Sequence, residues 1–283
     1  MTKLLSVRLV AILVGLGFAL IALYSFVVGA YAAITEEAAG HVPYEKPEDI
    51  AYSFDGPFGK WDIQQLQRGF KVYDEVCAAC HSLKYVAFRD LEQIGYDEGQ
   101  VKAFAASKQV PGIDANTGEA TMRPGLPTDY FPSPYPNNVA AAAANNNAIP
   151  PDLSLMTKAR GDGTNYVASL LAGYAEPSAE LLEEHPEAAP GPGLYHNPYF
   201  PNLNLAMAPP LTTAGQVTYD DGTEATVQQM SEDVAAFLTW TAEPTLVARK
   251  QTGWPVLIFL LFATVLAYMS KKQIWAAAKR KGD

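Results

Sequence analysis

Residues 77–81 read Cys-Ala-Ala-Cys-His, and this short stretch decides what the rest of the chain must fold around. A Cys-x-x-Cys-His run is the attachment motif of a c-type haem. The two thiols add to the two vinyl groups of the ring, and the adjacent imidazole binds the iron. We therefore predict one covalently bound haem c, held by Cys77, Cys80 and His81.

Two other kinds of site also use closely spaced cysteines, namely a zinc centre and a thioredoxin-like redox pair. A structural zinc ion needs four ligands, yet Cys77 and Cys80 are the only cysteines among 283 residues. A redox pair usually accompanies a βαβ pattern, and the sequence shows none. Both alternatives are weaker interpretations than haem attachment.

The second axial position of the iron has several candidate ligands. A methionine there raises the reduction potential and suits electron transfer. The candidates within residues 36–248 are Met122, Met156, Met207, Met230, His41, His185 and His196. Met207 stands in Leu205-Ala-Met-Ala-Pro-Pro210, where small neighbours allow close approach and prolines stiffen the loop. This context favours Met207, although a loop methionine that packs on the core would look the same.

Two long uncharged runs predict membrane helices. They cover Leu9–Thr35 and Gln251–Ser270, and about 20 helical residues span the roughly 30 Å core of a bilayer. The second run is followed by a basic tail that contains Lys271 and Lys272, which is a stop-transfer pattern. The first run is longer than the apolar core of a typical signal peptide, so a retained signal anchor is favoured over a cleaved signal.

These runs divide the chain into four predicted segments. Residues 1–35 form the N-terminal hydrophobic signal or anchor helix, and residues 36–248 form the exported domain. Residues 249–270 form the C-terminal transmembrane helix, and residues 271–283 form a basic tail on the inner side. The positive-inside rule places both ends on that side.

Charge is distributed unevenly between these segments. Residues 36–248 contain 29 Asp and Glu against 11 Lys and Arg, which is −18, while the remainder contributes +8 to the total of −10. An acidic surface steers a basic partner toward it. The same acidity argues against nucleic acid as a partner, because phosphate binding needs Lys and Arg.

The exported domain is predicted to be mainly α with long loops. A helix should begin after Asp62 and run into the cysteine motif, and another should follow the cap Thr226 and end before Pro244. Shorter helices are expected in 88–107 with a break near Gly95, in 139–144 and in 164–174. The remaining expectations are an irregular stretch over 109–151, an exposed loop over 176–193 and one short strand over 216–219.

Several stretches together resemble one known family, the cytochrome c1 family. They are Arg68-Gly-Phe-x-Val-Tyr-x-Glu-Val-Cys-x-x-Cys-His-Ser82, Asp129-Tyr-Phe-Pro132, Ala144-Asn-Asn146, Pro150-Pro-Asp-Leu-Ser154, Gly193-Leu-Tyr-x-Asn-Pro-Tyr-Phe-Pro201, Ala206-Met-Ala-Pro-Pro210, Tyr219-x-Asp-Gly-Thr-x-Ala-Thr226 and Ala242-Glu-Pro244. The resemblance covers roughly residues 50–280. A lone Cys-x-x-Cys-His motif would name no family, whereas this combination is specific.

The resemblance implies roles for individual residues. His81 and Met207 would be the axial ligands of the iron, and Arg160 would pair with a haem propionate. Tyr166 would lie near the haem, and Pro151 would pack in the haem crevice. Some bacterial members carry an extra cysteine pair as a disulfide; this chain lacks it, so no disulfide is expected.

The resemblance also implies a function within a membrane complex. The chain would be the haem subunit of ubiquinol:cytochrome c oxidoreductase, taking an electron from the Rieske iron–sulfur protein and reducing a basic cytochrome c. Its expected neighbours are cytochrome b, membrane lipid and the second half of a dimeric complex. The haem domain would face the periplasm of a bacterial inner membrane, with the C-terminus in the cytoplasm.

Other haem proteins are the alternatives. A membrane-bound peroxidase needs an accessible iron, which a Met207 ligand would close, and a haem sensor usually carries a signalling domain after the membrane span. The haem subunit of another c-type oxidoreductase is the remaining alternative, and the family stretches argue against it.

Overall fold

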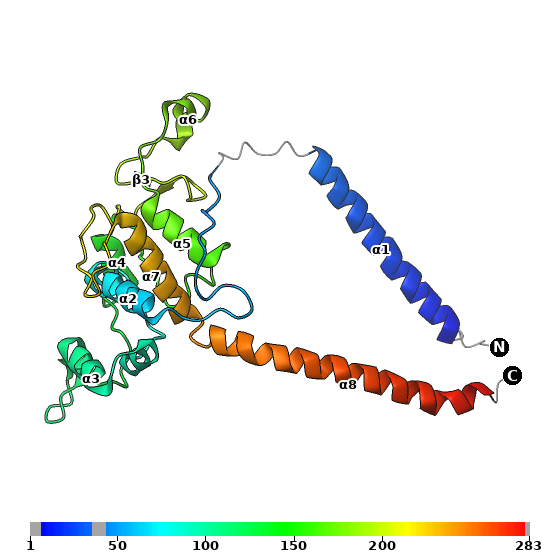
Figure 1. Ribbon diagram of the computed structural model, residues 1–283. Coiled ribbons are helices and arrows are strands. Elements are labelled where there is room, and N and C mark those ends of the chain that lie inside the picture. Colours follow the sequence, from blue (N-terminus) through cyan, green and yellow to red (C-terminus); the bar gives the residue numbers. More distant parts are fainter. Residues whose placement is uncertain (1–6, 36–43, 281–283) are drawn as a thin grey trace. The chain divides into compact units, whose positions relative to one another are not determined.

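The computed structural model describes residues 7–35 and 44–280, which belong to two compact units, Met1–Pro43 and Tyr44–Asp283 (Figure 1). The described part of the first unit is helix α1 (Val7–Thr35). Its apolar stretch Leu9–Tyr31 has a mean hydropathy of 2.5, and none of it is buried. By length and composition, α1 is one of two described helices able to cross a membrane.

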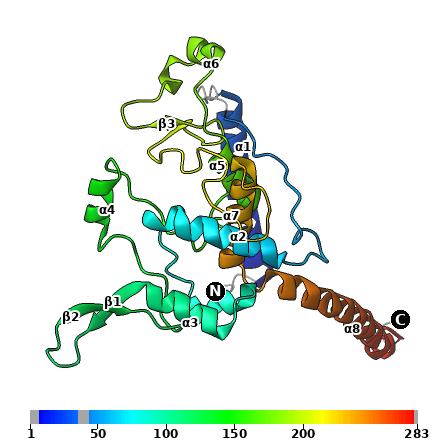
Figure 2. The ribbon, with the colours of Figure 1, turned by 60° about the vertical axis from the view of Figure 1, so that its left-hand side comes forward.

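The second unit is built on two helices that pack side by side, α2 (Ile63–Glu75) and α7 (Val227–Ala242) (Figures 1 and 2). Both predicted caps are confirmed. The Asp62 carboxylate accepts a hydrogen bond from the Gln65 amide at 3.2 Å, and the Thr226 hydroxyl accepts one from the Gln229 amide at 3.0 Å. Each cap satisfies a backbone N–H that the first helical turn leaves without a partner.

Gly69 lets α2 and α7 approach each other closely. A Cβ atom added to Gly69 would overlap the carbonyl oxygen of Asp233 and would lie 2.8 Å from the Cβ of Phe237. Beside this contact the Phe70 ring packs on the Phe237 ring, with centroids 5.6 Å apart. Only glycine therefore fits at the point where the two helices touch.

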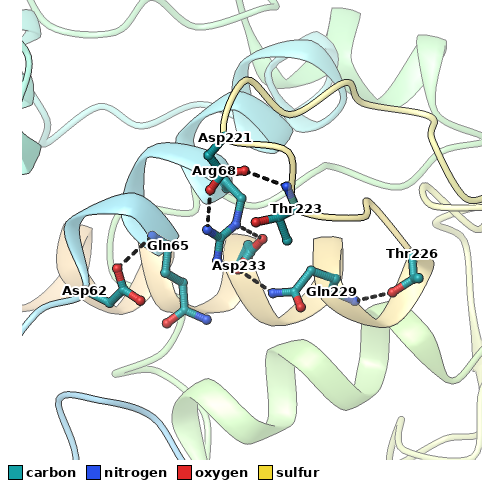
Figure 3. A network of polar contacts seen from close by, with 8 residues as sticks. All are labelled: Asp62, Gln65, Arg68, Asp221, Thr223, Thr226, Gln229 and Asp233. Carbon is teal, nitrogen blue, oxygen red and sulfur yellow. Dashed lines mark hydrogen bonds and ion pairs between the residues drawn. The ribbon is translucent and has the colours of Figure 1, made fainter.

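An ion pair joins the two helices next to Gly69 (Figure 3). The Arg68 guanidinium donates through Nε to Asp233 Oδ2 at 2.8 Å and through Nη2 to Asp233 Oδ1 at 3.1 Å. It also reaches Asp221 at 2.7 Å. The Asp233 side chain is fully buried, and the Gln229 amide gives it a further hydrogen bond of 2.9 Å. This fork-shaped pairing satisfies a carboxylate that would be costly to bury alone.

The other elements are short, and the prediction of a mainly helical domain is confirmed. Those before residue 150 are η1 (Cys77–Ala79), η2 (Phe88–Ile94), α3 (Glu98–Ser107), β1 (Gln109–Ile113), β2 (Ala120–Pro124) and α4 (Asn138–Ala144). Those after it are α5 (Gly163–Ala172), α6 (Ala179–Glu184), η3 (Pro186–Ala188), β3 (Tyr195–His196) and β4 (Asn204–Leu205). The expected break near Gly95 is present, and Gly95 has a φ of +93°.

Three local expectations were wrong. The stretch 109–151 contains the antiparallel hairpin β1–β2 (Figure 2), whose turn is closed by the Asp114 carboxylate accepting from the Asn116 and Thr117 amides. The acidic stretch 176–193 contains α6, capped by the Ser178 hydroxyl at 3.1 Å from the Leu181 amide. Residues 216–219 are not a strand, because the Gln216 side chain bonds to Pro210 and Thr212 in a compact loop.

Helix α8 (Leu246–Arg280) follows α7 after the short break at 243–245. It has 35 residues, so it is about 52 Å long at 1.5 Å per residue. The helix therefore exceeds the roughly 30 Å core of a bilayer and continues past Ser270 into the basic tail. The Lys250 ammonium donates to the carbonyl of Phe54 at 2.9 Å, which attaches the first turns of α8 to the domain.

We expect Gly69→Ala to destabilise the domain by at least the roughly 1–3 kcal/mol typical of overpacking, because the new methyl group meets backbone and not a movable side chain. Denaturant unfolding of the purified full-length chain measures the change. Gly191→Ala is the control, since its Cβ would meet only Leu194 at an ordinary 3.8 Å. Equal stabilities of the two variants would contradict close packing of α2 on α7 at Gly69.

Candidate haem site

Helix α2 ends just before the cysteine motif. Because α2 packs in the core, the motif lies against the core as well. The chain then turns tightly, because the amides of Cys80 and His81 both donate to the Cys77 carbonyl, at 3.1 and 2.9 Å. Cys77 and Ala78 pack against the hydrophobic core. The turn brings two thiols and one imidazole together at the end of a single helix, as a thioether-linked haem requires.

The His81 imidazole is oriented by a backbone carbonyl. Its Nδ1 lies 2.7 Å from the carbonyl oxygen of Pro151, and a carbonyl only accepts, so Nδ1 carries the proton. Nε2 is then left with its lone pair free for a metal. Burial lowers the pKa of His81 below its usual 6.5, despite opposing effects of the Pro151 carbonyl and Asp152. The imidazole is therefore neutral at pH 7 and competent as a ligand.

A second set of contacts ties the same segment to residues 151–153. The Asp152 carboxylate accepts from the Ser82 hydroxyl at 2.7 Å and from the Lys84 amide at 2.8 Å. The Leu153 amide donates to the Ser82 carbonyl at 2.9 Å. The structure thus brings Pro151 and His81 together as a pair. The positioning role of Asp152 was missed, although Asp152 lies inside one of the family-like stretches.

The Cys77 thiol does not resemble that of a reactive redox pair. Burial raises the pKa of the Cys77 thiol to about 12, and the neighbouring Cys80 adds to the effect. Reactive cysteine pairs instead have lowered thiol pKa values. The Tyr135 hydroxyl lies 3.7 Å from the Cys80 sulfur. The raised pKa of Cys77 therefore argues against a disulfide-exchange role.

Met207 and Arg160 lie in a second group of residues linked through tyrosines. The Tyr174 hydroxyl donates to the Met207 carbonyl at 3.0 Å, which fixes the Met207 backbone. Burial raises the pKa of Tyr166 above its usual value, and the Arg160 guanidinium opposes this shift, so the two side chains interact. Tyr166 in turn adds to the raised pKa of Tyr174. The role of Tyr174 was missed, because it appeared only as the last residue of a predicted helix.

Arg160 is available for an acidic ligand. Its side chain is exposed, and its guanidinium donates to the Ala159 carbonyl at 3.1 Å. Within residues 44–280, none of the salt bridges involves Arg160. Guanidinium groups bind carboxylates in a bidentate manner, and the pairing of Arg160 with a propionate stays a prediction.

The competing axial candidates occupy different environments. Met230 is fully buried in α7, Met122 is exposed on β2, and His185 bonds to Glu187 at 3.1 Å. His196 is buried in β3, and His41 lies outside the described residues. Met156 and Met207 are both half-buried against the core. Met207 as the axial ligand therefore stays a prediction, with Met156 as its nearest rival.

The donor set fits a covalently bound haem. Two thiols, a neutral imidazole with a fixed tautomer and partly buried thioethers are the groups that such a cofactor requires. A mainly helical domain with these groups at the end of its first helix belongs to the class of c-type cytochromes.

Comparison with known proteins then specifies the family. Residues 52–278 match the Cytochrome C1 family, and the chain belongs to this family. The family implies haem c, with which Cys77, Cys80 and His81 are consistent.

Similar proteins come from bacteria and from mitochondria. The chain is 46% identical over 237 residues to cytochrome c1 of Rhodospirillum rubrum, covering 81% of this chain and 87% of that protein. It is 44% identical over 232 residues to the mitochondrial cytochrome c1 heme protein of Saccharomyces cerevisiae, covering 82% and 72%. It is 45% identical over 264 residues to the "Cytochrome b/c1" of Bradyrhizobium diazoefficiens, covering 85% of this chain but only 37% of that longer protein.

We expect Tyr174→Phe to loosen the loop that carries Met207. The lost hydrogen bond is worth about 0.5–1.5 kcal/mol, so a methionine–iron bond formed by Met207 should break at lower temperature. The far-red methionine-to-iron absorption band of the haem-loaded chain reports this directly. Tyr195→Phe is the control because Tyr195 is exposed on β3. An identical melting of the band in both variants would contradict a positioning role for Tyr174.

Proposed function

We propose that this chain is the electron-transfer haem subunit of a bc1-type ubiquinol:cytochrome c oxidoreductase. The observation that carries the proposal is the His81 imidazole, which directly follows the cysteine pair and has its Nδ1 bound to the Pro151 carbonyl at 2.7 Å. Membership of the cytochrome c1 family supports the same function. The chain alone makes and breaks no substrate bond, so its part in the enzyme is to accept and donate single electrons.

Each site residue has a separate task in this proposal. Cys77 and Cys80 would form the thioethers, and His81 and Met207 would bind the iron. Arg160 would bind a propionate, Tyr166 would lie near the haem, and Pro151 orients His81. When bound, the haem supplies a reversible one-electron couple. Met207 as a ligand would discourage oxygen binding, and the burial of His81 favours the neutral imidazole.

The proposed partners follow from the family and from the charges. The Rieske iron–sulfur protein is the electron donor, a basic cytochrome c is the acceptor, and cytochrome b lies beside the membrane anchor. The name of the Bradyrhizobium relative joins cytochromes b and c1, which supports the last of these. We further propose a dimeric complex in a bacterial inner membrane, with a periplasmic haem domain and a cytoplasmic C-terminus.

The acidic stretch around α6 is the proposed steering surface for the acceptor. Between Arg160 and Arg249 the chain has 12 acidic residues and no Lys or Arg. Glu180, Glu183 and Glu184 lie on α6, and Glu187 follows in η3. Because these charges are in the exposed part of the domain, they can attract a basic protein before contact and release it as salt is added.

We expect Met207→Leu to lower the reduction potential of the haem substantially, by a sizeable share of the roughly 0.8 V over which axial ligands set haem potentials. A redox titration followed by absorption spectroscopy measures it in the purified complex. Met156→Leu is the matched control, since Met156 is half-buried against the same core. A large drop for Met156→Leu with none for Met207→Leu would assign the ligand to Met156.

We expect the double variant Glu183→Gln, Glu184→Gln to slow the reduction of a basic cytochrome c several-fold at low salt. The difference should vanish near 1 M salt, where the Debye length is about 3 Å. Stopped-flow rates across ionic strengths measure both effects. The control is Glu92→Gln, Glu119→Gln, which removes two exposed charges elsewhere. Equal slowing by the two variants would show that only the net charge matters, which would contradict a specific steering surface at α6.

A further inference from the structure

An exposed phenylalanine lies beside the first turns of the anchor helix. The Phe58 side chain is 75% exposed, and its ring stacks on Trp254 of α8 with centroids 6.1 Å apart and 21° between the ring planes. Trp254 is itself 43% exposed. Figure 1 shows the chain segment before α2 passing next to the start of α8. Two large aromatic rings are thus presented to the surroundings at one point.

The loop that carries Phe58 is closed by hydrogen bonds and by a tight turn. The Tyr52 amide donates to the Asp55 carboxylate at 2.7 Å, and the Lys60 amide donates to the Ser53 carbonyl at 2.9 Å. Phe54 is buried in the core. Gly59 has no room for a side chain, because an added Cβ would lie 2.5 Å from the Asp55 carbonyl oxygen. A loop held in this way keeps Phe58 outside instead of letting it collapse onto the core.

The aromatic pair lies at the start of the uncharged run of α8, where this helix is expected to enter the membrane. Trp254 is the fourth residue of the uncharged run 251–270, and Arg249 and Lys250 come directly before that run. They are the first basic residues after Arg160. The Lys250 ammonium bonds to the Phe54 carbonyl at 2.9 Å, so the loop and the helix entry are one connected structure. Lys60 adds an exposed cation beside Phe58.

This combination matches the chemistry of a phospholipid interface. Aromatic side chains concentrate at the level of lipid headgroups, and Lys and Arg near them meet the phosphates. We propose that Phe58 and Trp254, together with Lys60 and Lys250, form a phospholipid-binding contact that seats the domain on the bilayer. The occupant is a phospholipid. The two rings contact the region between its acyl chains and its headgroup, and its phosphate lies near the ammonium groups of Lys60 and Lys250.

The contact would restrict how the domain moves on its anchor. The first turns of α8 are held to the domain by the buried Leu246 side chain and by the bond from Lys250 to the Phe54 carbonyl. A second point of attachment at Phe58 fixes the angle. The proposal rests on α8 spanning the membrane and not on the electron-transfer function, so either can fail without the other.

Photo-cross-linking in native membranes tests the contact. The photoreactive residue p-benzoylphenylalanine is placed at position 58 of the full-length, haem-loaded chain, and in a second variant at position 254. Position 113 is the matched control, because Ile113 is also 75% exposed but lies on the β1–β2 hairpin. After irradiation, mass spectrometry of the purified chain identifies the adducts.

The expected result is a covalent adduct of phospholipid mass at positions 58 and 254, at least tenfold more abundant than at position 113. An adduct with another polypeptide at position 58 would overturn the proposal, because a neighbouring subunit would then cover the ring. Equal lipid yields at 58 and 113 would overturn it as well, since adventitious lipid would explain both. An unchanged haem spectrum shows that each variant is folded.

Discussion

The close crossing of α2 and α7 is the constraint on which the rest of the domain depends. Gly69 lets the backbones touch, and the Arg68–Asp233 pair holds them in register (Figure 3). Helix α2 continues into the cysteine motif, and α7 is followed after three residues by α8. This one contact therefore positions both the cysteine motif and the start of α8.

The haem site itself depends on contacts between segments that are far apart in the chain. His81 and Pro151 are 70 residues apart, yet one hydrogen bond of 2.7 Å fixes which imidazole nitrogen can bind iron. Asp152 and Ser82 close the same junction. Elsewhere in the domain, the Tyr174 hydroxyl donates to the carbonyl of Met207, the predicted second ligand. The core that supports both groups thus predetermines the tautomer and the loop position, instead of leaving them to the cofactor.

Capping residues and glycines predicted the helix ends that they themselves stabilise. Asp62 and Thr226 start helices because a side-chain oxygen beside free amides works within one turn, and Gly95 separates η2 from α3 through its positive φ. The β1–β2 hairpin was missed because Pro111, Gly112 and Pro124 are poor strand residues; their extended backbone is imposed by pairing with the opposite strand. The predicted strand at 216–219 failed for the reverse reason, since no partner strand packs against that loop in residues 44–280.

The sequence alone determined three features of this protein. They are the thiols and imidazole of residues 77–81, the apolar lengths of the two long helices and the −18 charge of residues 36–248. These follow from spacing and composition, which need no partner. Packing alone decided the neutral, oriented state of His81, the pairing of Arg68 with Asp233 and the exposed Phe58 on Trp254. Each of these depends on a neighbour tens to nearly two hundred residues away, and only burial and close approach in three dimensions bring such neighbours together.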